Sequence, residues 1–236
     1  MMWACPRLKC RRGPAFRCTP RTDYRAAGCR SNPSREMQSL HMEPRIDFQG
    51  PFSWFGGDLP CVFDSDAAKH MGVYVWTANT SHGEFAYYIG DTGRTFAARF
   101  LEHLKEYASG VYRIYDADAF TLGEKRLVWL GSLSRPKEER QAAVLEFFNR
   151  MEEFAPQLRA FLHTHRLYLA PFEGEQRLRR RIEAGLARHW YDQQGLIGEF
   201  QDPGIWYQWR KADEQPIEVT VTFPSSIQGL NNTILA

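Results

Sequence analysis

The sequence predicts an α+β protein, and three observations carry this prediction. Residues 72–76 and 84–90 are rich in β-branched and aromatic residues and flank a turn cluster, which indicates an antiparallel hairpin. Residues 96–107 follow with apolar side chains at helical spacing. Residues 166–171 are predicted to form a further short strand that ends at proline, and residues 173–190 a second helix.

The hairpin carries the tyrosines of interest. Side chains alternate between the two faces of a strand, so Tyr74 shares a face with Trp76. In the second strand the same alternation puts Tyr88 with Gly90 and opposite to Tyr87.

The helix over residues 96–107 follows this hairpin, and Thr95 is its predicted N-cap. Arg99 and His103 are four residues apart, so they share one helix face. We expect that face to lie beside the apolar stripe rather than on it. The chain therefore sets a tyrosine-bearing hairpin against a helix that presents a cation and an imidazole.

These segments resemble the GIY-YIG nuclease domain. The resemblance rests on Gly72-Val73-Tyr74, on Tyr88-Ile89-Gly90, and on Arg99, which follows eleven residues after the second tyrosine. It implies a small three-stranded antiparallel sheet flanked by helices. It also implies an endonuclease that cuts DNA phosphodiester bonds with one divalent metal ion, Mg²⁺ or Mn²⁺.

The resemblance implies a role for each residue of the pattern. Tyr74 would deprotonate or orient the attacking water, and Tyr88 would hydrogen-bond water or phosphate nearby. Arg99 would neutralise the scissile phosphate with a fork that matches its oxygens. His103 would relay the proton or pair with Tyr74.

The helix over residues 173–190 is the most basic of residues 46–236. Within its arginines, Glu183 matches by resemblance the metal-binding carboxylate, and Glu175 is the weaker candidate. In the alternative interpretation Glu183 makes a surface ion pair with Arg179 or Arg180. Those two arginines are also the predicted DNA contacts on this helix.

The resemblance further implies an asparagine close to the site, after the helix that carries the glutamate. Asn232 is the candidate for this substrate-binding role, with Asn231 as the alternative.

Residues 111–163 exceed what the resemblance requires and are interpreted as an insertion. Strands are expected at 111–115 and 127–130, followed by a long helix with Ser134 as its N-cap. Pro156 is expected to kink or end that helix. Residues 191–236 form a second elaboration, rich in Gly and aromatic residues.

Charge is distributed unevenly along the chain. The formal net charge is +2, but residues 1–45 contain ten Lys or Arg against three Asp or Glu, or +7, which leaves −5 for residues 46–236. We interpret residues 1–45 as a disordered basic leader and residues 46–236 as a single domain. The alternative for the leader is upstream sequence, with Met37 or Met42 as the start. The leader holds four of the five cysteines, but they lack the C-x2-C spacing of a zinc module.

The remaining cysteine, Cys61, is the only one in residues 46–236, which favours a reducing cytoplasm. No run of eighteen apolar residues predicts a membrane span. We therefore expect a cytoplasmic, metal-dependent endonuclease that acts on DNA, with no membrane and no small-molecule cofactor. The alternative is a non-catalytic nucleic-acid-binding or adaptor protein that retains the same fold.

Overall fold

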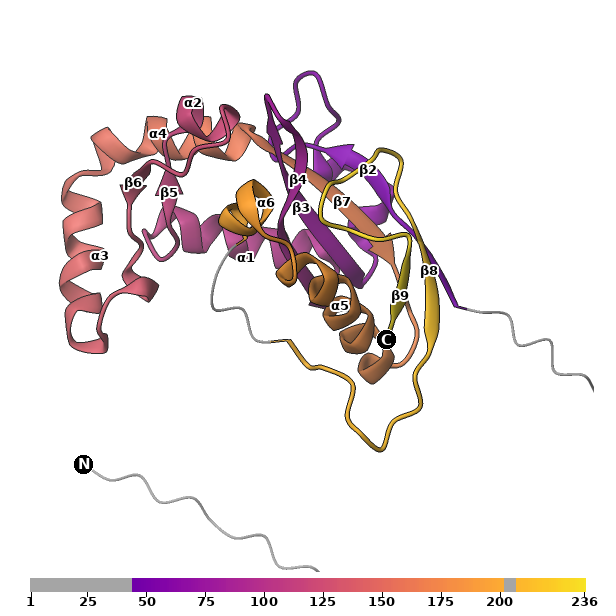
Figure 1. Cartoon of the computed structure of the whole chain (residues 1–236). Helices are drawn as coiled ribbons and strands as arrows, with labels where there is room; N and C mark the ends of the chain where they lie inside the picture. The colour runs from indigo at the N-terminus through magenta and orange to yellow at the C-terminus, as the bar shows by residue number, and fades with distance from the viewer. Residues whose placement is uncertain (1–43, 202–206) are drawn as a thin grey trace, which may run out of the picture. The chain divides into compact units, whose positions relative to one another are not determined.

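The hairpin predicted from the tyrosine-bearing segments lies at one edge of a four-stranded antiparallel sheet with the order β2-β7-β3-β4 (Figure 1). The computed structural model describes residues 44–201 and 207–236. The four strands are β2 (Gln49–Phe52), β7 (His165–Pro171), β3 (Gly72–Thr80) and β4 (Gly83–Thr92). The resemblance implied three strands, and β2 is the additional one.

Two smaller sheets accompany the central one. In the first, β1 (Arg45–Asp47) pairs in parallel with β8 (Glu218–Thr222), which pairs antiparallel with β9 (Thr233–Leu235). The second consists of β5 (Ile114–Tyr115) and β6 (Leu127–Trp129), which are shorter than the strands predicted there. The chain is thus α+β, as predicted, with mixed as well as antiparallel pairing.

The helices flank the central sheet. They are α1 (Phe96–Ala108), α2 (Ala117–Thr121), α3 (Arg140–Asn149), α4 (Met151–His163), α5 (Gln176–Tyr191) and α6 (Gly195–Phe200). Short 3-10 turns η1 to η4 cover Val62–Asp64, Asp66–Lys69, Ser132–Ser134 and Lys137–Glu139. Among the described residues, no helix is both long and apolar enough to cross a membrane.

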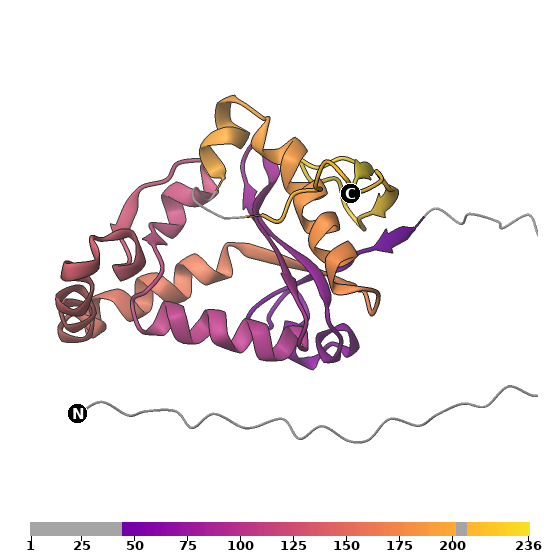
Figure 2. The ribbon, with the colours of Figure 1, turned by 90° about the horizontal axis from the view of Figure 1, so that it is seen from below.

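The central sheet separates two hydrophobic cores. Figure 2 shows the strands between α1 on one side and α5 with the three-stranded sheet on the other. The first core includes Tyr74, Trp76, Phe100, Phe120 and Phe161. The second core includes Val73, Val75, Ile182, Trp190 and Val219. Because β3 alternates between these cores, both faces of the strand are buried from Gly72 to Ala78.

A β-bulge changes the predicted alternation in β4. Trp76 pairs with Tyr88 but the next residue, Thr77, pairs with Ala86, so Tyr87 is an extra residue in the strand. As a result Tyr87 and Tyr88 both pack on the first core. The prediction that Tyr88 and Tyr87 lie on opposite faces is therefore wrong.

The helical insertion is divided differently from its prediction. Ser134 ends a 3-10 turn instead of capping a helix, because Pro136 is extended and α3 begins only at Arg140. The break between α3 and α4 falls at Arg150, and Pro156 lies inside α4. Packing of buried residues on either side of Pro156 maintains that helix despite the lost backbone donor.

The predicted disordered leader lies outside the described residues up to position 43. Its last residue, Arg45, instead begins β1, where it is paired with Thr220 of β8. The leader cysteines also lie outside the described residues.

The first core predicts a large cost for truncating Phe161, which is fully buried against the rings of Tyr107, Phe120 and His165. Phe161→Ala should lower the free energy of unfolding by about 3–5 kcal/mol, because it removes buried apolar contacts and leaves a cavity. Phe148→Ala, at a position 54% exposed, is the matched control and should change it by less than about 0.5 kcal/mol. Denaturant titration measures both, and equal effects would contradict this core assignment.

Candidate active site

Tyr74 and Gly90 are directly opposed in the β3–β4 hairpin, and the absence of a side chain at Gly90 creates room for the tyrosines. A Cβ at Gly90 would lie 2.5 Å from the Tyr74 hydroxyl and 2.9 Å from Cε1 of Tyr88. The two tyrosine rings instead stack with their centroids 5.9 Å apart. Glycine is therefore required at position 90 by close approach.

Helix α1 brings Arg99 and His103 to the Tyr74 hydroxyl. The Thr95 side chain caps the helix by accepting the N–H of Ala98. His103 Nε2 then lies 2.9 Å from the Tyr74 hydroxyl, to which Arg99 Nε donates at 3.3 Å. The predicted convergence of these side chains is thus present in the structure.

The position of His103 on α1 differs from its prediction. The imidazole is 1% exposed and lies on the buried stripe of the helix, not beside it. The side chain of Arg99 keeps 30% of its surface exposed and donates from Nη1 to Glu102 Oε2 at 3.2 Å. The cation can therefore reach a ligand at the surface, whereas the imidazole cannot.

Burial fixes the protonation of this cluster. Desolvation, followed by the charge of Arg99, lowers the pKa of His103 to about 3, so the imidazole is neutral. A neutral imidazole donates from one nitrogen and accepts at the other; Nε2 lies against the Tyr74 hydroxyl, and Nδ1 lies 3.4 Å from the Tyr112 hydroxyl. In the tautomer protonated at Nδ1, Tyr74 donates its proton to Nε2 while its oxygen accepts from Arg99.

Tyr74 is a neutral phenol in this environment. It is fully buried, and burial followed by the nearby Tyr88 raises its pKa well above the usual value. The neighbouring Arg99 opposes this shift. The role implied by the resemblance needs surroundings that favour the phenolate form of Tyr74. Arg99 acts in this direction, because its charge and hydrogen bond lower the pKa of Tyr74.

Glu183 lies on α5, on the opposite face of the sheet from the tyrosine cluster. Burial, followed by the charge of Asp91, raises its pKa from the ordinary 4.5 to about 8. Burial also raises the pKa of Tyr88, and Glu183 adds to that increase. Since β4 is an edge strand, side chains from both faces can meet beside it.

The arginines of α5 make no ion pair with Glu183, and their charges lower its pKa less than burial and Asp91 raise it. Arg179 Nε instead donates to Asp91 Oδ2 of β4 at 2.9 Å, and Arg180 Nη1 donates to Gln208 Oε1 at 3.2 Å. In the described part of the chain Glu183 has no ion pair, so the predicted alternative of a pair with either arginine is not observed. Arg179 is 3% exposed, and this burial argues against its predicted contact with DNA.

Asn232 lies apart from the other candidates. It is exposed and lines a cavity with residues of β8 and the following loop, such as Thr220 and Ser225. Its carbonyl oxygen accepts the N–H of Val221. The structure thus gathers Tyr74, Tyr88, Arg99 and His103, places Glu183 near enough for its charge to raise the pKa of Tyr88, and leaves Asn232 elsewhere.

Three residues of the cluster were not predicted. Glu102 follows Arg99 by three positions, and this helical spacing could have revealed the pair. Asp91 follows the second strand motif directly and binds Arg179. Tyr112 carries no local signal, because its contact with His103 depends on the chain's path after α1.

The candidate metal ligand is a single carboxylate. Among residues 44–201 and 207–236, no group of three or more His, Cys, Asp or Glu side chains could hold a metal ion. Mg²⁺ can nevertheless bind through one carboxylate, because it retains several waters and takes phosphate oxygens as further ligands. Glu183 fits this role because it is partly exposed and makes no ion pair among the described residues. Its carboxyl binds an ion only after losing the proton that its raised pKa retains, so binding is expected to strengthen as pH rises toward about 8.

Comparisons with protein-family models, curated proteins and solved structures found no match to this chain.

The raised pKa of Glu183 predicts a pH-dependent difference in stability between the protein and Glu183→Gln. The folded protein keeps this proton up to about pH 8, whereas the unfolded chain loses it near 4.5. Between these values the folded state binds more protons, so the contribution of Glu183 to stability falls as pH rises. Glutamine mimics the neutral carboxyl, so the variant should match wild type at pH 5 and melt higher at pH 9.

Thermal unfolding across this pH range measures the effect. Glu138→Gln, at an exposed position on η4, is the matched control and should show a constant difference from wild type. A Glu183→Gln difference that does not grow with pH would contradict the assigned environment.

Proposed function

We propose that this protein is a metal-dependent endonuclease of the GIY-YIG type that hydrolyses DNA phosphodiester bonds. The observation that carries the proposal is the convergence of Tyr74, Tyr88, Arg99 and His103 in one cluster. Residues that only filled a core would not require the Tyr74 hydroxyl to meet both a guanidinium and a neutral imidazole. DNA is the substrate that the resemblance implies.

The surface-accessible members of the cluster would receive the substrate. Arg99 is partly exposed and offers a planar set of donors that matches phosphate oxygens. Tyr88 is also partly exposed and would hydrogen-bond the attacking water or the phosphate. A divalent ion bound to Glu183 would supply charge neutralisation at the phosphate and a lowered pKa for bound water.

The buried members would orient the attacking water. As the water oxygen bonds to phosphorus and the bond to the leaving oxygen breaks, the water proton passes to solvent and the leaving oxygen takes a proton from solvent. Tyr74 would orient the water, and its contact with the neutral imidazole of His103 would hold the phenol ring in place. Arg99 would hold the same hydroxyl, because it donates to the Tyr74 oxygen.

The complete burial of Tyr74 favours a second candidate, a non-catalytic nucleic-acid-binding protein of the same fold. In that case the tyrosine cluster is packing, and Arg99 contacts phosphate without hydrolysis. The two candidates differ in their dependence on Glu183, because binding without chemistry does not need a metal-binding carboxylate.

Cleavage of supercoiled plasmid by the full chain tests the proposal. With Mg²⁺ or Mn²⁺ the protein should nick or linearise the plasmid, and chelation of the metal should stop the reaction. Arg99→Ala and Glu183→Gln should each lower the rate by at least about 100-fold, since each removes charge stabilisation at the phosphate.

Arg159→Ala on α4 is the matched control, because Arg159 is exposed and distant in sequence from every candidate residue. It should cleave at the wild-type rate. If plasmid and a library of duplex sequences stay intact while the protein still shifts DNA in a gel, the non-catalytic candidate replaces the nuclease.

A further inference from the structure

A groove on α5 lies outside the tyrosine cluster. Its volume is about 420 Å³, which is within the size range of small-ligand sites. We call it the arginine–tryptophan groove, and its lining residues are Arg181, Ala184, Gly185, Arg188, Tyr191, Asp192, Trp209, Arg210, Pro216 and Leu235. It therefore lies between α5, the segment 209–216 and β9.

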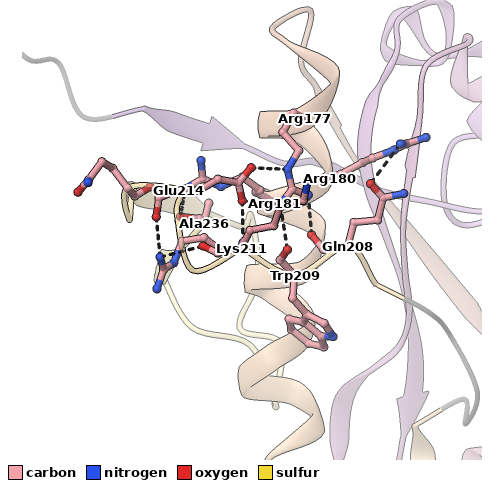
Figure 3. Close-up of polar contacts among 10 residues, drawn as sticks. Arg177, Arg180, Arg181, Gln208, Trp209, Lys211, Glu214 and Ala236 are labelled. Atoms are coloured by element: carbon pink, nitrogen blue, oxygen red, sulfur yellow. Dashed lines mark hydrogen bonds and ion pairs between the residues drawn. The ribbon is translucent and has the colours of Figure 1, made fainter.

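Arg177 and Arg181 of α5 hold the segment after residue 207 against the helix (Figure 3). Arg177 donates to Glu214 Oε1 at 2.6 Å and to the carbonyl oxygens of Gln208 and Trp209. Arg181 Nη2 donates to the carbonyl oxygens of Gln215 and Ala236 at 2.5 and 2.6 Å. The groove wall is thus fixed to the helix by charge-assisted hydrogen bonds.

Two exposed guanidinium groups remain available at the groove. Arg188 makes no side-chain hydrogen bond or ion pair with any residue in the described ranges. Arg210 donates to the carbonyl oxygens of Lys211 and Glu214, so its charge has no carboxylate partner in the same part of the chain. Among the described lining residues, three arginines face the single carboxylate of Asp192, which leaves a net charge of +2.

Arg181 adds a buried unsatisfied donor to the same wall. Its side chain is 8% exposed, and its Nε has no hydrogen-bond partner among the described residues. A buried charged group with an unused donor is costly unless a ligand or solvent satisfies it.

An aromatic surface lies beside these cations. Trp209 is 45% exposed, although large apolar side chains are normally covered. The centroid of its ring lies 5.8 Å from that of the buried Tyr207 ring, and the two rings pack edge to face. Figure 3 shows the indole extending away from the polar contacts of its own segment. Nucleobases stack on aromatic rings of this kind, and guanidinium groups bind the adjoining phosphates.

We propose that the arginine–tryptophan groove binds an unpaired nucleotide of a single-stranded nucleic-acid segment, with its base on Trp209 and its phosphates at Arg188 and Arg210. The small volume fits one nucleotide and not a duplex face. A base in a duplex is already stacked, so its face is not free for the indole. This inference rests on the proposed function and defines its substrate class as DNA with a single-stranded segment.

The groove and Glu183 share one helix. Arg188 follows Glu183 by five residues, or about 7.5 Å along the helix axis. Their side chains are on different faces, so variants in the groove need not alter the tyrosine cluster.

Fluorescence anisotropy of a labelled twelve-residue oligothymidylate tests the proposal with the full chain in EDTA. Arg188→Ala combined with Arg210→Ala should weaken binding at least about 10-fold and lower the salt slope by about 1.4, or about 0.7 for each lost phosphate contact. Trp209→Ala should weaken binding about 10-fold and Trp209→Phe much less, because phenylalanine still stacks.

Arg159→Ala is the matched control and should bind as wild type does. Arg188→Glu serves as a second variant if the loss of Arg210 unfolds the segment, because Arg188 holds no described side chain in place. Unchanged binding by Arg188→Glu and Trp209→Ala would overturn the proposal. If the groove variants lost affinity for a matched duplex as much as for the oligothymidylate, the single-stranded assignment would be overturned. It would also be overturned if the wild type bound free thymidine monophosphate as tightly as the oligothymidylate.

Glu183→Gln separates this inference from the proposed function, since it should bind the oligothymidylate normally but not cleave DNA. Metal-dependent cleavage with binding unaffected by the groove variants would reject the groove alone. Groove-dependent binding without cleavage under any metal would reject the nuclease alone.

Discussion

The structure depends on the cross-strand pairing of Tyr74 with Gly90. Only a residue without a side chain at position 90 lets the Tyr74 ring lie across β4, where its hydroxyl meets His103 and Arg99. The neutral state of His103 follows from the same burial, because desolvation disfavours the imidazolium. The missing side chain at Gly90 therefore affects both the packing of the first core and the contacts of the Tyr74 hydroxyl.

The edge position of β4 supplies the second constraint. An edge strand lets α1 on one face and α5 on the other bring side chains to the same margin of the sheet. Arg179 binds Asp91 across this margin, which leaves Glu183 half-buried without a cation beyond the weaker effect of the α5 arginines. A bound divalent ion would stabilise the ionised form of such a carboxylate. The electrostatics at the edge of the sheet are therefore linked to the proposed chemistry.

Local patterns predicted the elements that local interactions determine. The hairpin, α1, β7 and α5 follow from alternation, helical spacing and caps, and Tyr74, Tyr88, Arg99 and His103 follow from motif order. The fourth strand β2 could not be predicted, because its Gly50-Pro51 pair disrupts alternation and its partner β7 is more than a hundred residues away. The bulge at Tyr87 and the partners of the α5 arginines likewise depend on tertiary contacts, which local sequence patterns do not encode. Arg179 illustrates this limit, because its place on a basic helix predicted a contact with DNA, whereas the structure shows an ion pair with Asp91.

The central claim is that Glu183 at this edge holds the divalent ion used in phosphodiester hydrolysis. Titration of the full chain with Mn²⁺ at pH 8.5, followed by electron paramagnetic resonance of the free ion, measures this directly, because Mn²⁺ binds the same carboxylate and water ligands as Mg²⁺. The account predicts one bound Mn²⁺ that is lost in Glu183→Gln and retained in Glu138→Gln. Equal Mn²⁺ binding by the wild type and Glu183→Gln would contradict it.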